Sequence, residues 1–434
     1  MKKNQIDRRK FIQYSAAGVA LAASANTVIG AKHITMNQVF GNEEMHITSE
    51  TDVLVIGGGT AGTIAAIQAA RLGAKTLLVE RGAQLGGTTT TGGVAFPGIF
   101  HAWGKQVISG IGWELVVDTV LLDGGTLPDF SLEINNTTVR HWRHQIHVNP
   151  FLYAILAEEK CEESGVEIAY YESPQSIFKT EEGWQVECAG FGTRRRVLCK
   201  QLIDCTGGAE VVGLLNLPRL REEEMQPGSI LFLLDKANNP GRPNGPGTGT
   251  LNALYVHGAN SSNSLTVTAA NLTGRKAILE KVREEKKRLM HMQAETAFRE
   301  SYRIVGETII TVDDYTSGRV FDDAVCYAFY PVDLHEKDGV KPKPLTKGTV
   351  PTIPLSALIP KGSRNIIVAG RCISSDRLAN SGLRVQASCM AMGQAAGVAA
   401  ALAVRKNTTP HKVSLTDIRE MLHSNGAIVP DLKE

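Results

Sequence analysis

Residues 52–62 read Asp52-Val-Leu-Val-Ile-Gly-Gly-Gly-Thr-Ala-Gly62. The four apolar residues at positions 53–56 predict a short buried strand, and positions 60–72 predict a helix. A second apolar run at positions 76–79 predicts another strand, which Glu80 follows directly. A strand, a glycine turn, a helix, a second strand and an acid in this order are typical of a dinucleotide-binding βαβ unit.

The three glycines of the turn have G-x-G-x-x-G spacing, and each has a physical role in such a unit. Gly57 permits the tight turn, Gly59 lets the backbone approach a pyrophosphate, and Gly62 lets the helix pack closely on the strand. The start of the helix offers free N–H groups to the phosphates, and Glu80 is placed to accept hydrogen bonds from a ribose. The turn alone does not distinguish NAD from FAD. The alternative is a glycine turn that binds no nucleotide. The order and spacing of the strand, the helix, the second strand and Glu80 disfavour this alternative.

The length and charge of the chain limit its class. A chain of 434 residues fits two domains, or one large domain with an insertion. The first 25 residues carry five basic side chains and one acidic one, so the balance of 46 basic and 44 acidic residues becomes 41 and 43 without them. This balance gives no support for nucleic acid or an anionic membrane surface as a partner, and the partner expected below is a small-molecule substrate.

The N-terminus resembles a bacterial twin-arginine export signal. Arg8 and Arg9 precede a mildly apolar, Ala-rich run at residues 16–25, which is too short and too weakly apolar for stable membrane insertion. We therefore expect residues 1–31 to be the signal and the start of a linker, residues 32–50 to be linker, and the protein to be periplasmic or otherwise exported. A chance Arg-Arg pair in a disordered tail is the alternative. Because this route carries folded proteins, it suits a protein that acquires a cofactor before export.

The seven cysteines include no C-x-x-C pair, so the sequence predicts no iron–sulfur or zinc site and no other metal. We expect them to be small buried hydrophobes.

The rest of the chain predicts a discontinuous nucleotide-binding domain. Its segments are residues 51–100, 145–215 and 346–410, with a C-terminal helix and tail at 411–434. Asn149-Pro150 predicts the start of an amphipathic helix over residues 151–164. Residues 101–144 and 216–345 are expected to form a substrate or cap region. Within it, positions 273–301 read as a charged helix and positions 302–333 alternate as strands do.

At this point the residues resemble the FAD-dependent oxidoreductases of the glutathione-reductase-like superfamily, and within it the group related to fumarate reductase flavoproteins. The resemblance implies an α/β fold, with a FAD/NAD(P)-binding Rossmann-like domain of the glutathione-reductase type and an inserted α+β substrate domain. It also implies FAD as the cofactor. No second G-x-G-x-x-G follows a strand, so a separate nicotinamide domain is not expected. The resemblance covers residues 52 to about 403 and rests on five blocks at 57–62, 80–88, 204–208, 330–335 and 368–376, the last continued by 384–397.

The family carries its cofactor contacts onto matching positions of this chain. The glycine turn would face the pyrophosphate, and Glu80 would contact the adenosine ribose. The Gly/Thr run at residues 85–94 would lie beside the ribityl chain and the isoalloxazine. The helix that begins near Arg384 would point its N-terminus at the flavin N1–C2=O edge, where reduced flavin is negative. The implied cofactor-binding residues are Gly57, Gly59, Thr60, Ala61, Gly62, Glu80, Arg81, Gly86, Gly87, Thr88, Thr91, Gly92, Gly93, Thr206, Gly207, Gly370, Asp376, Gly382, Leu383 and Arg384.

Three groups of residues are candidates for the chemistry. Asp333 and His335 stand at i, i+2, so on a strand both would share one face, where the acid could orient the histidine for proton transfer. Arg143 and His141, in the stretch Val139-Arg-His-Trp-Arg-His-Gln-Ile-His147, would share a face if that stretch is extended. Arg303 could clamp a carboxylate. The alternatives are a structural Asp–His bond, a solvated polar strand or loop, and an ion pair of Arg303 with Glu307.

These observations predict an exported flavoenzyme that transfers a hydride between a small organic substrate and FAD, with His335 as acid or base. A reductase of an activated C=C bond, similar to fumarate reductase, is one alternative. A non-catalytic binding protein on the same fold is the other. The separate electron donor or acceptor is unknown.

Overall fold

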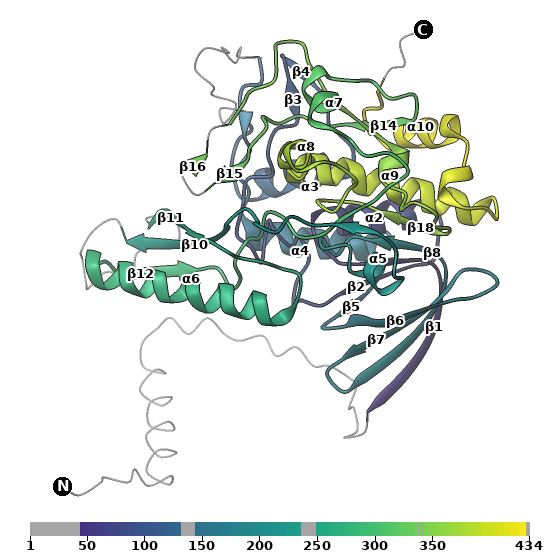
Figure 1. Cartoon of the computed structure of the whole chain (residues 1–434), viewed down its shortest axis with the longest axis horizontal. Coiled ribbons are helices and arrows are strands. Elements are labelled where there is room, and N and C mark those ends of the chain that lie inside the picture. The colour runs from purple at the N-terminus through teal and green to yellow at the C-terminus, as the bar shows by residue number, and fades with distance from the viewer. Residues whose placement is uncertain (1–43, 132–143, 236–248, 337–338, 341, 431–434) are drawn as a thin grey trace, which may run out of the picture. The chain divides into compact units, whose positions relative to one another are not determined.

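The computed structural model describes residues 44–131, 144–235, 249–336, 339–340 and 342–430 (Figure 1). The expected export signal, most of the expected linker, and the candidates His141 and Arg143 lie outside these residues.

A sheet with a parallel centre organises the fold (Figure 1). Its strand order is β5-β2-β1-β8, and β18 pairs with β8. All these pairings are parallel, so the carboxyl ends of the strands meet at one edge. The strands are β1 (Met45–Ile56), β2 (Thr76–Glu80), β5 (Glu167–Tyr170), β8 (Thr193–Asp204) and β18 (Ile366–Val368).

β8 is long enough to pair with two different strands along one of its edges. Residues 193–199 pair antiparallel with β7 (Trp184–Gly190), which pairs with β6 (Ser173–Lys179), whereas residues 202–204 pair with β18. On its other side β8 pairs with β1 from Met45 onwards. The expected linker at 32–50 is therefore wrong for its last residues, because residues 45–50 already form strand. Their alternation of exposed and half-buried side chains hid this strand among polar residues.

Two helices lie together on one face of the sheet: α2 (Thr60–Arg71) and α9 (Gln386–Arg405). A Cβ atom at Gly393 would lie 2.2 Å from the Ala61 carbonyl oxygen, and one at Gly397 would lie 2.5 Å from that of Ala65. Glycine at these positions therefore lets the two backbones approach closely. Among the described helices, only α9 has the length and hydropathy of a membrane span, and it is 94% buried as a core helix.

Further helices enclose this face, and the expected ones are confirmed. α4 (Pro150–Glu163) begins as predicted after Asn149, whose side chain accepts hydrogen bonds from the backbone N–H groups of Phe151 and Leu152. Lys160 of α4 pairs with Glu114 at 2.8 Å and so joins α4 to α3. The other helices here are α3 (Ile111–Leu122) and the C-terminal α10 (Leu415–Ser424), while α5 (Glu210–Leu214) follows β8.

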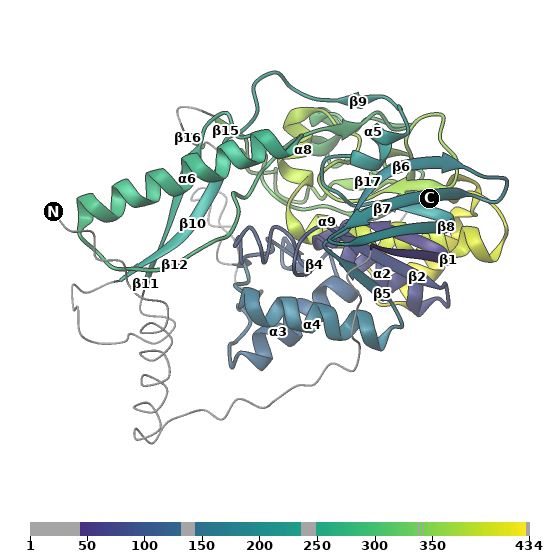
Figure 2. The same cartoon turned by 90° about the horizontal axis from the view of Figure 1, so that it is seen from below.

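A small sheet with its own apolar core follows β9. Strands run in the order β11-β10-β12, and α6 lies along one face of the sheet (Figure 2). Its core residues include Ile230, Phe232 and Ile278. The prediction of one helix over 273–301 is wrong at both ends, because the helix covers residues 264–285 and a strand follows. The elements are β10 (Gly228–Asp235), β11 (Gly249–Val256), α6 (Ser264–Glu285) and β12 (Leu289–Met292).

The strands expected over 302–333 are mostly absent from this described stretch. It contains β13 (Arg303–Ile304), α7 (Val312–Ser317) and β14 (Ala324–Tyr327), joined by irregular backbone. Apolar residues there alternate because they pack against the core from irregular chain. The remaining elements are β3 (His101–Ala102), β4 (Lys105–Gln106), β9 (Arg219–Leu220), β15 (His335–Glu336), β16 (Gly339–Val340), β17 (Thr352–Pro354), η2 (Leu355–Ala357), α8 (Arg377–Leu383) and η3 (Pro410–Lys412).

The structure thus has a mixed α/β fold. Glu44–Glu434 form one compact unit, so the division into a nucleotide-binding domain and a cap stays a prediction. All seven cysteines are free and buried, which confirms their expected place in the core.

The close approach of α2 and α9 predicts the effect of one methyl group. Gly393→Ala should lower the free energy of unfolding by about 1–3 kcal/mol, because its Cβ meets backbone rather than a movable side chain. Thermal denaturation measures this, with Ala391→Ser, at a half-buried position of the same helix, as the control. Equal midpoints for Gly393→Ala and wild type would contradict the proposed packing.

Candidate functional site

A cavity of about 380 Å³ opens at the carboxyl edge of the parallel strands. Its wall combines the glycine turn after β1, the end of β2, the turn after β8, residues 295–299 and the start of α9. Segments far apart in the sequence therefore form one site.

The glycines of the turn have two different roles: Gly57 and Gly62 are required by the fold, whereas Gly59 leaves space for a ligand. Gly57 has φ +98°, and a Cβ there would lie 2.5 Å from the Cys205 carbonyl oxygen; a Cβ at Gly62 would lie 1.8 Å from the Gly57 oxygen. These two glycines are needed by the protein itself. A Cβ at Gly59 meets no described atom within 4 Å, although Gly59 lines the cavity. The open space at Gly59 fits the close approach of a pyrophosphate.

Two helix N-termini without a capping side chain face this cavity. Gly59 precedes α2 and Val385 precedes α9. Of the first N–H groups of α9, that of Ala387 donates to the Pro97 carbonyl at 2.8 Å. Thr60 and Ala61 of α2 and Gln386 of α9 line the cavity wall. Unbonded N–H groups at such ends carry positive dipole and favour anionic groups. The site can therefore hold negative charge at two separate points.

Glu80 closes the end of β2 beside the glycine turn. Its two carboxylate oxygens accept hydrogen bonds from the backbone N–H groups of Gly58 and Gly82, each at 2.6 Å. Burial raises the pKa of Glu80 despite these bonds. Each oxygen keeps acceptor capacity for a ribose hydroxyl.

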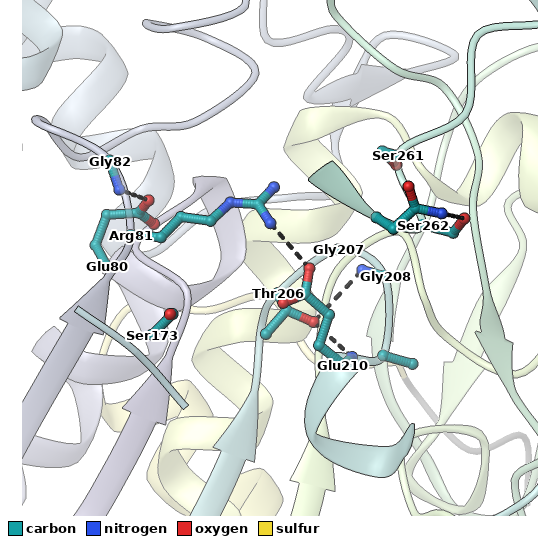
Figure 3. Close-up of polar contacts among 12 residues, drawn as sticks. Glu80, Arg81, Gly82, Ser173, Thr206, Gly207, Gly208, Glu210, Ser261 and Ser262 are labelled. Atoms are coloured by element: carbon teal, nitrogen blue, oxygen red, sulfur yellow. Dashed lines mark hydrogen bonds and ion pairs between the residues drawn. The ribbon is translucent and has the colours of Figure 1, made fainter. Parts of the chain in front are cut away.

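The turn after β8 forms the facing wall (Figure 3). Arg81 pairs with Glu210 at 3.0 Å. The Thr206 hydroxyl donates to the buried Asp204 carboxylate at 2.7 Å and accepts from the Glu210 N–H at 2.9 Å. Burial raises the pKa of Asp204. These bonds hold the Thr206–Gly207 turn rigidly at the cavity.

The Gly/Thr run is tied to the start of α9. The Thr89 hydroxyl donates to the Gln386 side-chain oxygen at 2.6 Å, and the Gln386 amide nitrogen donates to the Val94 carbonyl at 2.8 Å. These two bonds hold the Gln386 side chain at the start of α9. The N-terminal end of the helix dipole still faces the cavity.

Two arginines give the opposite end of the cavity a positive charge. Arg384 donates to the Asp333 carbonyl at 3.1 Å, and Arg299 donates to the Ser229 hydroxyl at 3.0 Å. Burial, together with the charge of Arg384, lowers the pKa of Arg299 to about 10. The Arg384 Nε is buried without a hydrogen-bond partner in the described part of the chain.

Asp333 and His335 meet, with 3.2 Å between the Asp333 carboxylate and His335 Nε2, although only His335 lies on a strand and Asp333 precedes it. The Arg384 guanidinium lies 3.7 Å from the same carboxylate. Although burial raises the pKa of Asp333, the His335 bond and Arg384 bring it below its usual range. Burial lowers the pKa of His335, against the effect of Asp333, so its ring is neutral at neutral pH. The pair does not line the cavity but touches Arg384, which does.

Arg303 lies elsewhere. It is buried, pairs with Glu222 at 2.6 Å, and donates to the Ser375 carbonyl at 3.0 Å. It does not line the cavity, and its partner is not the expected Glu307. We therefore do not retain Arg303 as a substrate clamp.

Most residues expected to contact a cofactor are on the cavity wall, although contact with FAD itself stays a prediction. Those on the wall are Gly57, Gly59, Thr60, Ala61, Glu80, Arg81, Gly87, Thr88, Thr91, Gly92, Thr206, Gly207, Gly370 and Arg384.

Six expected residues are absent from that wall and act within the described protein. The Asp376 carboxylate caps α8 through the Ala379 N–H at 2.7 Å. A Cβ at Gly382 would lie 2.5 Å from the Tyr315 hydroxyl, and Leu383 is core. Gly62 and Gly86 shape the turns beneath the wall, and a Cβ at Gly93 would collide with Gln293.

The sequence did not single out three residues of the wall. Gln386 was hidden because its function depends on Thr89, nearly 300 positions away. Arg371 stands inside a recognised block, yet its bonds to the carbonyls of Gly207, at 2.7 Å, and Phe298, at 2.6 Å, are tertiary. Arg299 has no signal, since it follows a highly charged stretch. The described residues contain no cluster of His, Cys, Asp or Glu that could hold a metal ion.

Comparisons with known proteins agree with this geometry. Dihydrolipoyl dehydrogenase of Caenorhabditis elegans is 58% identical over 41 residues, which are 9% of this chain and 8% of that protein. Pseudooxynicotine dehydrogenase of Pseudomonas sp is 36% identical over 93 residues, or 21% of this chain and 19% of that protein. The chain thus matches less than a fifth of either relative.

Solved structures are similar only distantly. A geranylgeranyl bacteriochlorophyll reductase-like protein from Thermoplasma acidophilum shares 12% identity, with a TM-score of 0.43 over 87% of this chain and 83% of that one. A flavoprotein/dehydrogenase from Cytophaga hutchinsonii shares 14%, with a TM-score of 0.43 over 86% and 82%. Neither structure adds to the assignment.

The sequence pattern of one family, described as FAD dependent oxidoreductase, matches residues 52–227 and 252–422. This match includes nearly all of the cavity wall. The chain therefore belongs to the FAD dependent oxidoreductase family, and its cofactor is FAD.

Proposed function

We propose that this protein is an exported flavoenzyme that transfers a hydride between a small organic substrate and FAD. The observation that carries the proposal is the Asp333–His335 pair, which touches the cavity residue Arg384. A proton-transfer group thus stands next to an arginine of the cavity wall.

The residues of the glycine turn and the two helix starts would hold FAD as in a glutathione-reductase-type domain. Gly59 and the α2 N-terminus suit the pyrophosphate, and Glu80 suits the adenosine ribose. The α9 N-terminus suits the negative edge of the reduced ring. FAD, when bound, supplies the hydride acceptor or donor, and every other function belongs to the protein.

His335 would move the proton. Its Nε2 faces the Asp333 carboxylate at 3.2 Å, which holds the ring in one orientation. A neutral ring can accept a proton from a substrate as a C–H bond breaks. The small sheet β11-β10-β12 with α6 would then be the inserted substrate domain, because the segment that follows β12 supplies Arg299 and its neighbours to the cavity.

The reverse direction, reduction of an activated C=C bond as in fumarate reductase, uses the same groups. Arg384 and Arg299 favour it, because cations beside a substrate stabilise negative charge that develops as hydride adds. The oxidised protein and the reduced protein are each mixed anaerobically with candidate substrates. Bleaching of the oxidised form indicates hydride transfer from the substrate, and return of colour to the reduced form indicates hydride transfer to the substrate.

The first prediction concerns FAD retention. Gly59→Val should lower the stability of the FAD-free protein by only about 1 kcal/mol, because its Cβ atom enters open space and the main cost is the loss of a favourable N-cap residue. It should abolish FAD binding, because that space is where a pyrophosphate would lie. The ratio of flavin to protein absorbance measures binding, and a fully loaded Gly59→Val protein would contradict the assignment.

The second prediction concerns His335. His335→Asn should slow flavin bleaching by an active substrate on the order of 100-fold or more. Because burial lowers its pKa, wild-type bleaching should fall only as the pH drops below 6.5 and the ring takes up a proton. This acid limb should vanish in the variant.

The exposed His423 of α10 provides the matched control, since His423→Asn should keep both rate and pH profile. An unchanged rate and profile in His335→Asn would remove His335 from the mechanism.

The third prediction concerns export, which Arg8 and Arg9 motivate. Replacing both by Lys should hold the FAD-loaded protein in the cytoplasm of a bacterium that has the twin-arginine route. Cell fractionation measures this, with Lys2→Gln and Lys3→Gln together as the control. Normal export of the double Arg variant would reject a twin-arginine signal.

A further inference from the structure

Arg299 and Arg384 line one end of the cavity. Asp333 is the carboxylate that contacts Arg384, and Glu295 lines the same wall. The buried Arg384 Nε and the buried Thr296 hydroxyl on this wall have no hydrogen-bond partner within the described residues. Buried donors without partners are costly unless a ligand uses them. An anionic group would accept both of these bonds.

An apolar sheet face begins at this same end. Side chains alternate along a strand, and those of Ile230, Phe232 and Leu234 pack towards α6. The intervening residues therefore point to the opposite face, which we call the outer face. It consists of Ser229, Leu231 and Leu233 on β10 and of Leu251, Ala253 and Tyr255 on β11, which are register partners in the order 229–255, 231–253 and 233–251.

The outer face is continuous with the cavity. The Tyr255 ring lies 5.2 Å from the Arg299 guanidinium and 5.6 Å from the His335 ring. From there the face extends along β11 to Leu251, roughly 13 Å away at about 3.3 Å per residue. Along β11, Leu251 is 55% exposed and Tyr255 47% exposed, so apolar surface is open to solvent there, whereas Ser229 and Leu231 of β10 are buried.

The outer face looks across to α4. His291 of β12 pairs in register with Leu233, and its ring lies 5.7 Å from that of Phe151 at the start of α4. Phe151 is itself exposed. Apolar groups thus flank the path on both sides, as in a site for an extended apolar group.

We propose that the substrate is an amphipathic organic anion. Its anionic group binds between Arg299 and Arg384, and its apolar chain lies along the outer face of the β11-β10-β12 sheet. The proposal rests on the proposed function and specifies its substrate class. The occupant of the outer face is this ligand rather than a second copy of the chain, because the face leads directly to Arg299 and Arg384 in the cavity.

Straight-chain carboxylates test this with the FAD-loaded protein. Acetate, hexanoate and decanoate are titrated against it, and the change in flavin absorbance gives a dissociation constant for each. Binding should tighten with chain length, by up to about fourfold for each methylene that leaves water. Decanol, without the charge, should bind at least tenfold more weakly than decanoate.

Three variants assign the two parts of the site. Leu251→Ser should weaken decanoate several-fold and leave acetate unchanged, whereas Arg299→Gln should weaken both acids by tenfold or more. Leu265→Ser is the matched control, because Leu265 is 81% exposed on α6, the helix that covers the other face. It should change no dissociation constant.

Equal affinities for the three acids, or equal effects of Leu251→Ser and Leu265→Ser, would overturn the proposal. So would a wild-type dimer in size-exclusion chromatography that Leu251→Ser converts to monomer, since the face would then be an interface between copies. A purified protein without flavin absorbance would instead refute the proposed function, so the two failures are distinguishable.

Discussion

The close packing of α2 against α9 is the contact on which the site depends. Gly393 and Gly397 let α9 approach the α2 backbone near Ala61 and Ala65 to a distance that no side chain allows. A buried amide bridge reinforces it, since Gln394 of α9 donates to the Gln68 side-chain oxygen of α2 at 2.9 Å. Because both helices begin at the carboxyl edge of the sheet, this contact sets the two helix N-termini on one cavity.

The two ends of the cavity carry different polar and charged groups, so they suit different parts of a bound molecule. At the Glu80 end, backbone N–H groups and a buried carboxylate dominate, which suits phosphates and ribose hydroxyls. At the Arg384 end, the guanidinium groups of Arg384 and Arg299 dominate, and Arg384 contacts Asp333, which does not itself line the cavity. Arg371 spans the middle, bonded to Gly207 on one side and Phe298 on the other. The turn after β8 is thereby held to the segment that follows the small sheet.

Local patterns predicted the nucleotide-binding part of the fold well. The βαβ unit, α4 and α9 stand as expected, each for a local reason. The βαβ unit has its glycine spacing, α4 has the start signal Asn149-Pro150, and α9 is a run rich in small and apolar residues. The strand at residues 45–50 was taken for linker, because half of its side chains face solvent and it is stabilised by pairing with β8. The end of α6 was misplaced because charged residues continue past the left-handed Lys286, where the helix stops.

By itself, the sequence indicated the βαβ unit and the closeness of Asp333 and His335, because these depend on residues close together in the chain. It also indicated the cofactor class, through blocks of sequence spread over residues 57–397. Only the tertiary structure decided that Arg384 and Arg299 lie at one end of the cavity, that Gln386 anchors to Thr89, and that Arg303 lies away from the cavity. Such contacts join segments separated by tens to hundreds of residues, and their partners are chosen by packing of the whole core. The same reason applies to the outer face of the small sheet, whose path to the cavity exists only once Tyr255 meets Arg299.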